Sequence, residues 1–512
     1  MFAKIHTGAI VGIDAVGVEA EANIAGGGIG LYIVGLPDNA VKESEQRIRA
    51  AFENTEYRMT AKKTVVNLAP ADLRKEGSLY DLPIAVAILA ATEQVQSSLT
   101  EDSMFIGELS LDGSLRAVKG VLPLVAMARQ RGLKRVFLPC DNVCEGVVVE
   151  GIDVVGVASL GEVADMLNGR RPIEPAVADM PSAAEETGGA YAEDFADVKG
   201  QGYVKRALEI AAAGGHNILM VGAPGSGKTM LARRMPTIMP PMTAAEALET
   251  TKIHSVAGKM GSHRGLIASR PFRAPHHLTS QVALIGGGQS PQPGEVSLAH
   301  NGVLFLDEMP EFGHSVLEVL RQPLEDRHIT ISRARYTVDY PANFTLVASM
   351  NPCPCGYYNH PTKECTCSAA AVHRYMGRIS GPLMDRIDIH VEVMPVSVAE
   401  MSSTRREESS EEIRRRVVAA RERQRERFAS AGIHTNAMMN SRMLRELSPL
   451  DRRSAELLER AMERLRLSSR AYDRIIKVAR TIADLEGAAD IAPSHISEAI
   501  GYRTLDRETW GR

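Results

Sequence analysis

At residues 222–229 the chain reads Gly222-Ala223-Pro224-Gly225-Ser226-Gly227-Lys228-Thr229, and this stretch determines how the rest of the sequence is interpreted. It follows the apolar run 217–221, which is typical of a buried strand, and precedes the helix-like residues 230–234. A G-x-x-x-x-G-K-[ST] pattern between a strand and a helix is typical of a phosphate-binding loop. Its glycines let backbone N–H groups turn toward a phosphate chain, and the helix adds the positive end of its dipole.

Two side chains of this loop have specific expected roles. Lys228 is expected to reach the terminal phosphates, and the Thr229 hydroxyl is expected to hold Mg²⁺. The alternative is a glycine-rich turn without a ligand, which the strand before it and the helix after it disfavour. The sequence therefore predicts that the chain binds a nucleoside triphosphate.

A second motif follows at residues 302–308. Gly302-Val-Leu-Phe-Leu306 is typical of a buried strand, and it ends in the adjacent acids Asp307 and Glu308. Paired carboxylates at a strand end are costly to bury unless a cation or water lies there. Asp307 suits the Mg²⁺ position, and Glu308 suits the base that polarises the attacking water. Acids that simply face solvent are the alternative. Together the two motifs predict ATP hydrolysis, with ATP and Mg²⁺ as cofactors.

Length and composition limit the class of protein. A chain of 512 residues is expected to form roughly two to four domains. It is 44% apolar and 24% charged, as soluble globular proteins are. Its net charge of −4 means that a nucleic-acid surface would be a local patch. Six cysteines in so long a chain do not predict a disulfide scaffold.

The apolar stretches indicate a cytoplasmic location. Even a long one, residues 82–91, is too short for a membrane span. The N-terminal apolar stretch contains Asp14 and has no basic leader, so it does not resemble a signal peptide. We therefore expect a cytoplasmic protein without a membrane partner.

Composition and periodicity divide the chain into four segments: an α/β region at 1–168, a linker rich in Pro, Ala, Glu, Ser and Gly at 169–194, an ATPase core at 195–394, and a helical region at 395–512. Within the first region, strands are expected at 8–12, 31–34, 64–67 and 135–138, and helices at 41–52 and 81–91. A short helix is possible inside the linker. The segment 405–427 alternates Glu and Arg at helical spacing, which favours a solvated helix face.

Four further boxes carry a resemblance to a known family. They are Arg270-Pro-Phe-Arg-Ala-Pro-His-His277, Pro293-Gly-Glu-Val-Ser-Leu-Ala-His-Asn-Gly302, Asn351-Pro-Cys-Pro-Cys-Gly356 and Asn67-Leu-Ala-Pro-Ala-Asp-Leu-Arg-Lys-Glu-Gly77. With the two ATPase motifs they resemble the magnesium-chelatase-like branch of the AAA+ ATPases, and within it the YifB/ComM group. The resemblance covers essentially the whole chain. It implies an α/β fold with an AAA+ P-loop NTPase core and a helical lid.

The resemblance also implies roles for individual residues. Asn351 follows the strand-like run 344–350, where this family has its first sensor, and an amide there can contact the γ-phosphate and the lytic water. Arg386 resembles the family's arginine finger, which a neighbouring subunit supplies, and so implies a homo-hexameric ring. A salt bridge from Arg386 to Asp385 or Asp388 is the alternative. Arg470 fits the second sensor, with Arg474 as a rival.

Four cysteines next to Asn351 form two C-x-C pairs, Cys353 with Cys355 and Cys365 with Cys367. Two such pairs joined by a polar loop can close a tetrahedral zinc site, so the segment 353–367 is a candidate zinc knuckle with a structural Zn²⁺. His360 could replace one thiol. Free thiols or a disulfide are the alternatives. Cys140 and Cys144 are expected to be packed thiols.

A basic hairpin is expected between the second ATPase motif and Asn351. Alternation and β-branched residues at 327–338 suggest two strands with Arg333 and Arg335 near the tip. In this ATPase branch the corresponding hairpin points into the ring channel, which implies contact with a nucleic-acid backbone. Ordinary solubilising arginines are the alternative. An inserted loop around 286–293 could form a second channel element.

The first region resembles the peptidase domain of Lon-type proteases. The similarity lies in Gly107-Glu-Leu-Ser-Leu-Asp-Gly113 and the region 67–81. Lon proteases use a Ser–Lys dyad. Here the lysine position falls on Leu122, and the serine position falls at 79–81, beside Ser78. The expected fold is thus a Lon-protease-like α/β domain lacking the Ser–Lys dyad, which serves as a binding or assembly module.

Three functions remain open from the sequence. The first is a hexameric, ATP-dependent DNA motor, a branch-migration helicase that acts on branched or single-stranded DNA in recombination or natural transformation. The second is a magnesium-chelatase-type metal-insertion motor subunit, which the fused Lon-like domain disfavours, so no porphyrin partner is expected. The third is a Lon-like ATP-dependent protease or unfoldase, which the missing dyad disfavours.

Overall fold

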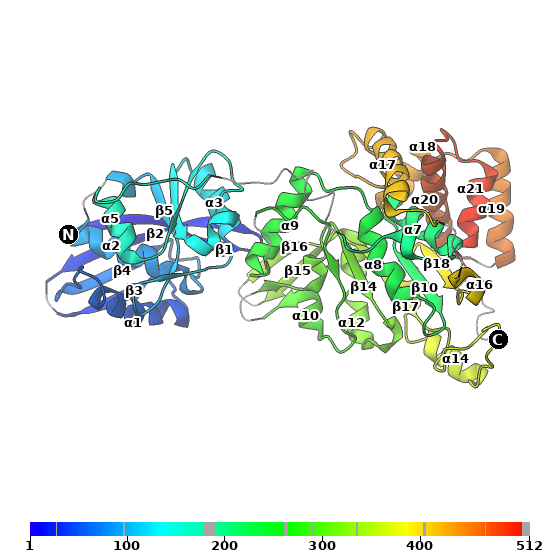
Figure 1. Cartoon of the computed structure of the whole chain (residues 1–512), viewed down its shortest axis with the longest axis horizontal. Coiled ribbons are helices and arrows are strands. Elements are labelled where there is room, and N and C mark those ends of the chain that lie inside the picture. Colours follow the sequence, from blue (N-terminus) through cyan, green and yellow to red (C-terminus); the bar gives the residue numbers. More distant parts are fainter. Residues whose placement is uncertain are drawn as a thin grey trace.

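The computed structural model describes residues 1–26, 28–95, 98–177, 191–260, 265–288, 291–333, 336–402, 406–465 and 467–503. The molecule is elongated (Figure 1). An N-terminal α/β region lies at one end, a second α/β region with a parallel sheet lies in the middle, and a group of helices lies beside that sheet.

The N-terminal region is built on a seven-stranded mixed sheet with the strand order β3-β4-β2-β1-β5-β8-β9. β1 pairs antiparallel with β2 and β2 with β4, whereas β5, β8 and β9 are parallel to β1. The strands are β1 (Phe2–Val11), β2 (Asp14–Ala25), β3 (Gly30–Val34), β4 (Lys63–Ala69), β5 (Ser103–Phe105), β8 (Arg135–Pro139) and β9 (Asp153–Val157), with the small hairpin β6 (Glu108–Leu109) and β7 (Leu115–Arg116). The four strands expected here are confirmed.

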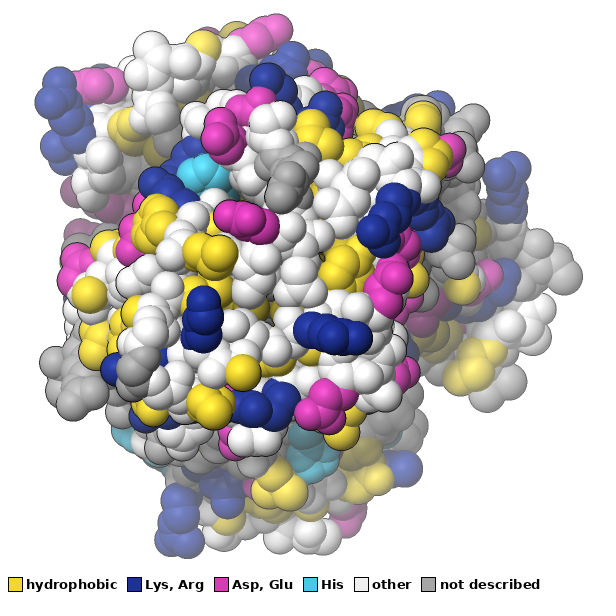
Figure 2. Space-filling model, turned by 90° about the vertical axis from the view of Figure 1, so that its left-hand side faces the viewer, with side chains coloured by type: hydrophobic (Ala, Val, Ile, Leu, Met, Phe, Trp, Pro, Cys, Tyr) yellow, Lys and Arg dark blue, Asp and Glu magenta, His cyan; other side chains and the backbone are white. Residues whose placement is uncertain are grey.

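Helices cover this sheet and complete its core. They are α1 (Asn39–Glu53), α2 (Asp81–Ala91), α3 (Val121–Gln130), α4 (Val143–Gly146) and α5 (Leu160–Leu167). After its first residue, Asp81, α2 is apolar on all sides, and almost every residue in it is therefore buried. The two helices expected at 41–52 and 81–91 are confirmed as α1 and α2. Figure 2 shows the outer end of this region, where acidic and basic side chains are intermingled with apolar ones.

The middle region contains a five-stranded, fully parallel sheet with the order β11-β14-β17-β10-β18. Its strands are β10 (Ile218–Gly222), β11 (Phe272–Arg273), β14 (Val303–Leu306), β17 (Thr345–Met350) and β18 (Ile389–Val393). The strands expected at 217–221, 302–306 and 344–350 are thus confirmed. Because the strands are parallel, their carboxyl ends meet at one edge, where ligands bind in such sheets.

Helices and two small hairpins surround this sheet. The helices are α7 (Gly202–Gly214), α8 (Lys228–Ile238), α9 (Ala244–Val256), α10 (Gln281–Ile285), α11 (Glu295–Leu298), α12 (His314–Glu318), α13 (Arg321–Asp326), α14 (Ala369–Met376) and α15 (Gly381–Met384). The hairpins are β12 (Gly286–Gly287) with β13 (Gln292–Pro293), and β15 (His328–Arg333) with β16 (Tyr336–Pro341). The hairpin expected at 327–338 is therefore confirmed, and the inserted loop around 286–293 contains the β12–β13 pair.

The last part of the described chain is helical, as expected. Its helices are α16 (Val398–Met401), α17 (Ser410–Arg427), α18 (Ser441–Leu447), α19 (Arg452–Leu465), α20 (Ser469–Glu486) and α21 (Pro493–Gly501). α17 and α20 pack against α7, and α17 also packs against α8, the helix that follows the phosphate loop. The helical region is thereby attached directly to the elements around the loop.

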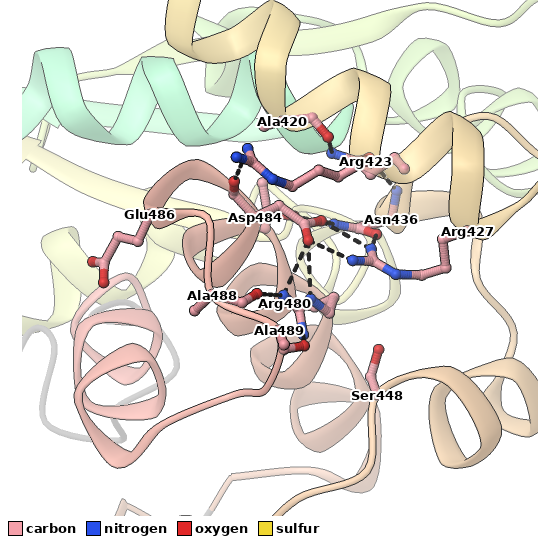
Figure 3. A network of polar contacts seen from close by, with 12 residues as sticks. Ala420, Arg423, Arg427, Asn436, Ser448, Arg480, Asp484, Glu486, Ala488 and Ala489 are labelled. Atoms are coloured by element: carbon pink, nitrogen blue, oxygen red, sulfur yellow. Dashed lines mark hydrogen bonds and ion pairs between the residues drawn. The ribbon is translucent and has the colours of Figure 1, made fainter.

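Most of the charged segment 405–427 forms α17, and the exposed positions of this helix carry Glu and Arg as expected, but the helix also has a buried face that was not expected. Ile413, Val417, Ala420 and Gln424 form a buried stripe along α17. Arg427 of the same helix donates a hydrogen bond to the buried carboxylate of Asp484 at 2.9 Å (Figure 3). One face of α17 is therefore part of the core, because its apolar residues recur every three or four positions. Some of its charged side chains form internal ion pairs.

The N-terminal region and the middle region meet where two helix ends face each other. The N–H of Gly120, just before α3, donates to the Ser255 carbonyl near the end of α9 at 3.1 Å. The Ser255 hydroxyl donates to the Glu145 carboxylate, and burial raises the pKa of that carboxyl. An ion pair of 2.8 Å joins Lys252 on α9 to Asp14. Head-to-tail helix ends attract each other through their dipoles, so α9 is fixed to the N-terminal sheet.

Two further findings concern exposure. Cys140 and Cys144 are exposed, so the expectation that they are packed thiols is wrong. Among the described residues, no helix is both long and apolar enough to cross a membrane.

Candidate ATP site and cysteine cluster

The phosphate loop connects β10 to α8, as its sequence predicts. β10 ends at Gly222 and α8 begins at Lys228. Gly227 has a φ of 93°, a conformation that favours glycine. A Cβ atom on Gly222 would lie 2.4 Å from the Val393 carbonyl oxygen of the neighbouring strand β18. Gly227 thus allows the backbone conformation of the loop, and Gly222 leaves room for its close packing on β18.

Lys228 lies inside the loop. Its ammonium group donates to the carbonyl oxygens of Gly222 at 2.7 Å and Ala223 at 3.0 Å, and to the Asn351 amide oxygen at 3.3 Å. Burial lowers the pKa of Lys228, while Asp307 and Glu308 oppose that shift. The Ser226 hydroxyl oxygen in the same loop is buried and has no hydrogen-bond partner within the described residues. A phosphate chain bound in this loop would offer acceptors to both groups.

Asp307 and Glu308 follow β14 at the same edge of the sheet. The Thr229 hydroxyl donates to one Asp307 oxygen at 2.9 Å, and the Ser349 hydroxyl donates to the other. The Glu308 N–H donates to Asp307 at 3.1 Å and contacts Ser349 Oγ at 3.3 Å. Glu308 is exposed and has a φ of 53°, an uncommon backbone conformation for a side chain of its size. A carboxylate held by hydroxyl donors beside a phosphate loop is suited to Mg²⁺.

The structure therefore brings together five residues that the sequence singled out: Lys228, Thr229, Asp307, Glu308 and Asn351. Sequence reasoning missed Ser349, which contacts both acids. A signal was present, because Ser349 is the one strongly polar residue near the end of the apolar strand 345–350 and lies two positions before Asn351. Alternation along a strand places positions 349 and 351 on one face.

The four cysteines of the expected knuckle come together between β17 and α14. The Sγ atoms of Cys353, Cys355 and Cys365 lie 3.3 to 3.7 Å from one another, and with Cys367 all four lie within 4.8 Å. All four are free thiols, so the disulfide alternative does not describe this structure. Four sulfurs about 2.3 Å from a tetrahedral zinc ion would lie about 3.8 Å apart. His360 accepts hydrogen bonds from Thr362 and Lys363 and is not among the clustered groups.

Comparison with known proteins identifies the family. A model of magnesium chelatase subunit ChlI matches residues 194–401, and a C-terminal model of that subunit matches residues 407–503. A third model, described as subunit ChlI of Mg-chelatase, matches residues 20–142. Competence protein ComM of Haemophilus influenzae is 43% identical over 507 residues, which cover 99% of this chain and 98% of that protein. The chain belongs to the ComM/YifB family.

Other relatives agree with this placement. Protein YifB of Salmonella typhimurium is 42% identical, over 99% of this chain and 97% of its own length. The ComM/YifB family is magnesium-chelatase-like, and the five-stranded parallel sheet with its phosphate loop is consistent with the AAA+ domain of that group. A shorter match, 26% identical over 106 residues, links 21% of this chain to an archaeal Lon protease of Methanocaldococcus jannaschii.

Three arginines that the ComM/YifB resemblance singles out are in ion pairs. Arg386 is largely buried and pairs with Glu325 at 2.5 Å. Arg470 pairs with Asp385 at 3.0 Å, and Arg474 pairs with Asp388. Burial by itself would raise the pKa of Asp388, but Arg474 and His216 hold the pKa of this carboxyl well below its usual range. The alternative partners considered for Arg386, Asp385 and Asp388, are thus wrong, because other arginines occupy them. The roles of Arg386, Arg470 and Arg474 toward a nucleotide stay predictions.

The two hairpins near the site are joined. The Tyr340 hydroxyl on β16 donates to the Pro291 carbonyl at 2.7 Å, next to β13. On the other side, Ile13 in the β1–β2 turn packs into the apolar cluster that contains Ile331 and Val338 of the β15–β16 hairpin. Arg335 and the side chain of Arg333 lie outside the described residues.

In the N-terminal region, Leu122 is fully buried where the resemblance to Lon proteases places a lysine. The Ser78 hydroxyl donates to the Glu108 carboxylate. Lys119 is exposed, and its side chain lies over Gly258, just after α9. Ser78 therefore has an acidic partner.

Proposed function

We propose that this protein is an ATPase that drives a DNA motor, and that the motor migrates DNA branches during recombination. The ATPase rests on one observation, the meeting of Lys228, Thr229, Asp307 and Asn351 at the edge of a parallel sheet. Membership of the magnesium-chelatase-like family supports it. The DNA cargo is supported by the relative whose name is competence protein ComM.

In this proposal each residue of the site has one task. Lys228 exchanges its carbonyl contacts for the terminal phosphates, and Asn351 holds the γ-phosphate and the attacking water. The exposed Glu308 polarises that water. Thr229 and Asp307 hold Mg²⁺, which neutralises charge on the phosphates when it is bound. Ser349 keeps Asp307 oriented.

A ring completes the site. Arg386 would leave Glu325 and contact the phosphates held by the neighbouring copy in a homo-hexamer, while Arg470, or Arg474, acts as the second sensor of its own chain. The Arg386–Glu325 pair is then a resting contact of the isolated subunit. A ring also gives the two hairpins a common channel.

The hairpins are the proposed DNA contacts. Arg333 and Arg335 would hold the phosphate backbone without regard to sequence. The Tyr340–Pro291 hydrogen bond makes the β12–β13 pair a second channel element that moves with the first. Changes between ATP-bound and ADP-bound states would shift the hairpins along DNA.

The remaining parts have supporting tasks. We propose domain limits at 1–168, 195–394 and 395–512, with a linker at 169–194. The N-terminal domain, Lon-protease-like but lacking the Ser–Lys dyad, serves in binding or assembly, which the buried Leu122 and the Ser78–Glu108 contact support. The four cysteines hold a structural zinc ion, because their thiols are free, clustered and correctly spaced.

The experiment measures ATP hydrolysis at low salt with no DNA, duplex DNA and branched DNA, for the wild type and for a variant with Arg333→Ala and Arg335→Ala. We expect branched DNA to stimulate the wild type and to stimulate the variant much less. The matched control is Arg452→Ala with Arg460→Ala, which removes the same charge from exposed positions of α19. Absence of stimulation by every DNA would contradict the motor on DNA, and absence of hydrolysis would contradict the ATPase.

A further inference from the structure

The cysteine loop, which comprises residues 351–368 between β17 and α14, touches the phosphate loop. Gly356 follows Cys355 and has a φ of 83°. A Cβ atom on Gly356 would lie 2.5 Å from Cδ and 2.8 Å from Cγ of Pro224, in the middle of the phosphate loop. The Gly356 N–H donates to the Cys353 carbonyl at 3.0 Å, which closes a tight turn around the first C-x-C pair. The turn therefore presses its glycine against the ring of Pro224.

A second connection runs through Asn351. This residue lies two positions before Cys353, and its amide oxygen accepts from Lys228 at 3.3 Å. The cysteine loop thus meets the phosphate loop twice, through Gly356 at Pro224 and through Asn351 at Lys228. Cys353, between these two points, is fully buried.

The other hydrogen bonds described within this loop are local, such as those that the Thr362 and Lys363 N–H groups donate to His360. Residues 351–368 contain no helix or strand. Tyr357 contacts His360 edge to face, and Lys363 lies over the Tyr357 ring, but these are single surface contacts. A segment without regular secondary structure loses much conformational entropy on folding. Four thiolate–metal bonds can supply the missing stabilisation, as they do in small zinc domains.

We propose that a zinc ion on Cys353, Cys355, Cys365 and Cys367 works as a strut that holds the phosphate loop and Asn351 in the geometry for ATP. This proposal rests on the proposed ATP site, and it adds that occupancy of the zinc site controls the affinity of the ATP site for nucleotide. Removal of zinc releases the Cys353–Gly356 turn, which releases Pro224 and Asn351. Nucleotide binding then weakens although no residue of the ATP site has changed, because the loop must be ordered at the moment of binding.

The central test uses Gly356→Ala, which keeps all four cysteines but forces the turn away from Pro224. We expect one zinc ion per chain by native mass spectrometry, as in the wild type, and an affinity for a fluorescent ATP analogue that is about tenfold weaker. The matched control is Gly132→Ala, at a glycine with a φ of 78° and open space around its Cβ position. The control carries the same backbone strain and should bind the analogue normally.

A second arm removes the metal. Cys365→Ser and chelator-treated wild type should lose zinc, bind the analogue about tenfold more weakly and show faster hydrogen exchange at residues 222–229. Hydrogen exchange reports the strut even without nucleotide. If the wild type binds no ATP analogue yet its loop exchanges faster after zinc removal, the proposed function fails and the strut stands. No zinc in protein purified without chelators, unchanged exchange, or equal affinities of Gly356→Ala and Gly132→Ala would overturn the strut.

Discussion

Asp81 in the N-terminal region and Asp307 in the middle region are held in similar ways, yet their charges are balanced differently. Each accepts a hydrogen bond from a serine hydroxyl, Ser44 for Asp81 and Ser349 for Asp307. Asp81 is fully buried and also accepts two hydrogen bonds from Arg47, at 2.6 and 2.9 Å. Asp307 is partly open to solvent and accepts from the Thr229 hydroxyl.

The difference separates a structural acid from a candidate ligand. A buried carboxylate with its own guanidinium partner is complete and contributes to one fixed fold. A carboxylate held by hydroxyl groups keeps its charge available for a cation that arrives from outside. Asp484 in the helical region follows the first pattern, since Arg427, Arg480 and Asn436 all donate to it (Figure 3). Only Asp307 of these three acids lies beside a phosphate loop.

The largest expected effect is on catalysis, at Asp307. Asp307→Asn keeps the shape of the side chain and can still accept the Thr229 hydrogen bond, but it removes the charge. ATP hydrolysis should fall by about a thousandfold, because the metal that carries transition-state charge is lost. Steady-state hydrolysis measures the catalytic activity of the variant, and thermal melting measures its stability. A melting temperature that collapses together with activity would show that Asp307 is a structural acid like Asp81.

The next effect is on stability, at Asp81. Asp81→Ala leaves the Arg47 guanidinium without its partner, which should lower the free energy of unfolding of the N-terminal region by about 3 kcal/mol. Urea unfolding measures it. The matched control is Glu45→Ala on α1, the helix that carries Arg47; the pair of Glu45 with Arg49 is more exposed and should matter by about 0.5 kcal/mol at most. If the two variants lower the free energy of unfolding equally, Asp81 is not a structural acid.

A smaller loss is expected at Arg427, one of several groups that donate to Asp484. Arg427→Met keeps the length of the side chain on α17 and leaves Arg480 in place, so the loss should be about 2 kcal/mol. Arg425→Met, at an exposed position of the same helix, is the control and should change stability by less than about 0.5 kcal/mol. Thermal melting measures both variants, and equal melting temperatures would show that the contact of Arg427 with Asp484 in Figure 3 adds no stability.

The ATP site could be predicted in large part because its residues occur in short motifs. Residues 222–229 and the pair Asp307-Glu308 each lie next to a strand, and parallel strands carry such segments to one edge. The pairing of Arg386 with Glu325 could not be predicted, because it depends on how α13 packs beside the segment after α15. The buried stripe of α17 was present in the sequence, but the density of Glu and Arg concealed it.

The smallest expected effect tests Ser349, the residue that the sequence did not reveal. Its hydroxyl donates to Asp307 and its oxygen contacts the Glu308 N–H. Ser349→Ala should raise the Mg²⁺ concentration for half-maximal hydrolysis by about tenfold, because groups that orient a metal ligand have effects of this size. The maximal rate at saturating Mg²⁺ should change much less.

Ser349→Thr is the matched variant, since it keeps the hydroxyl. It should restore the Mg²⁺ dependence even where the added methyl group lowers stability in this buried position. A shift in Mg²⁺ dependence confined to Ser349→Ala would show that Asp307 needs an oriented charge for a cation. Equal Mg²⁺ dependence in the wild type and Ser349→Ala would show that Thr229 and the Glu308 N–H suffice to hold Asp307, and Ser349 would then be a packing residue of β17.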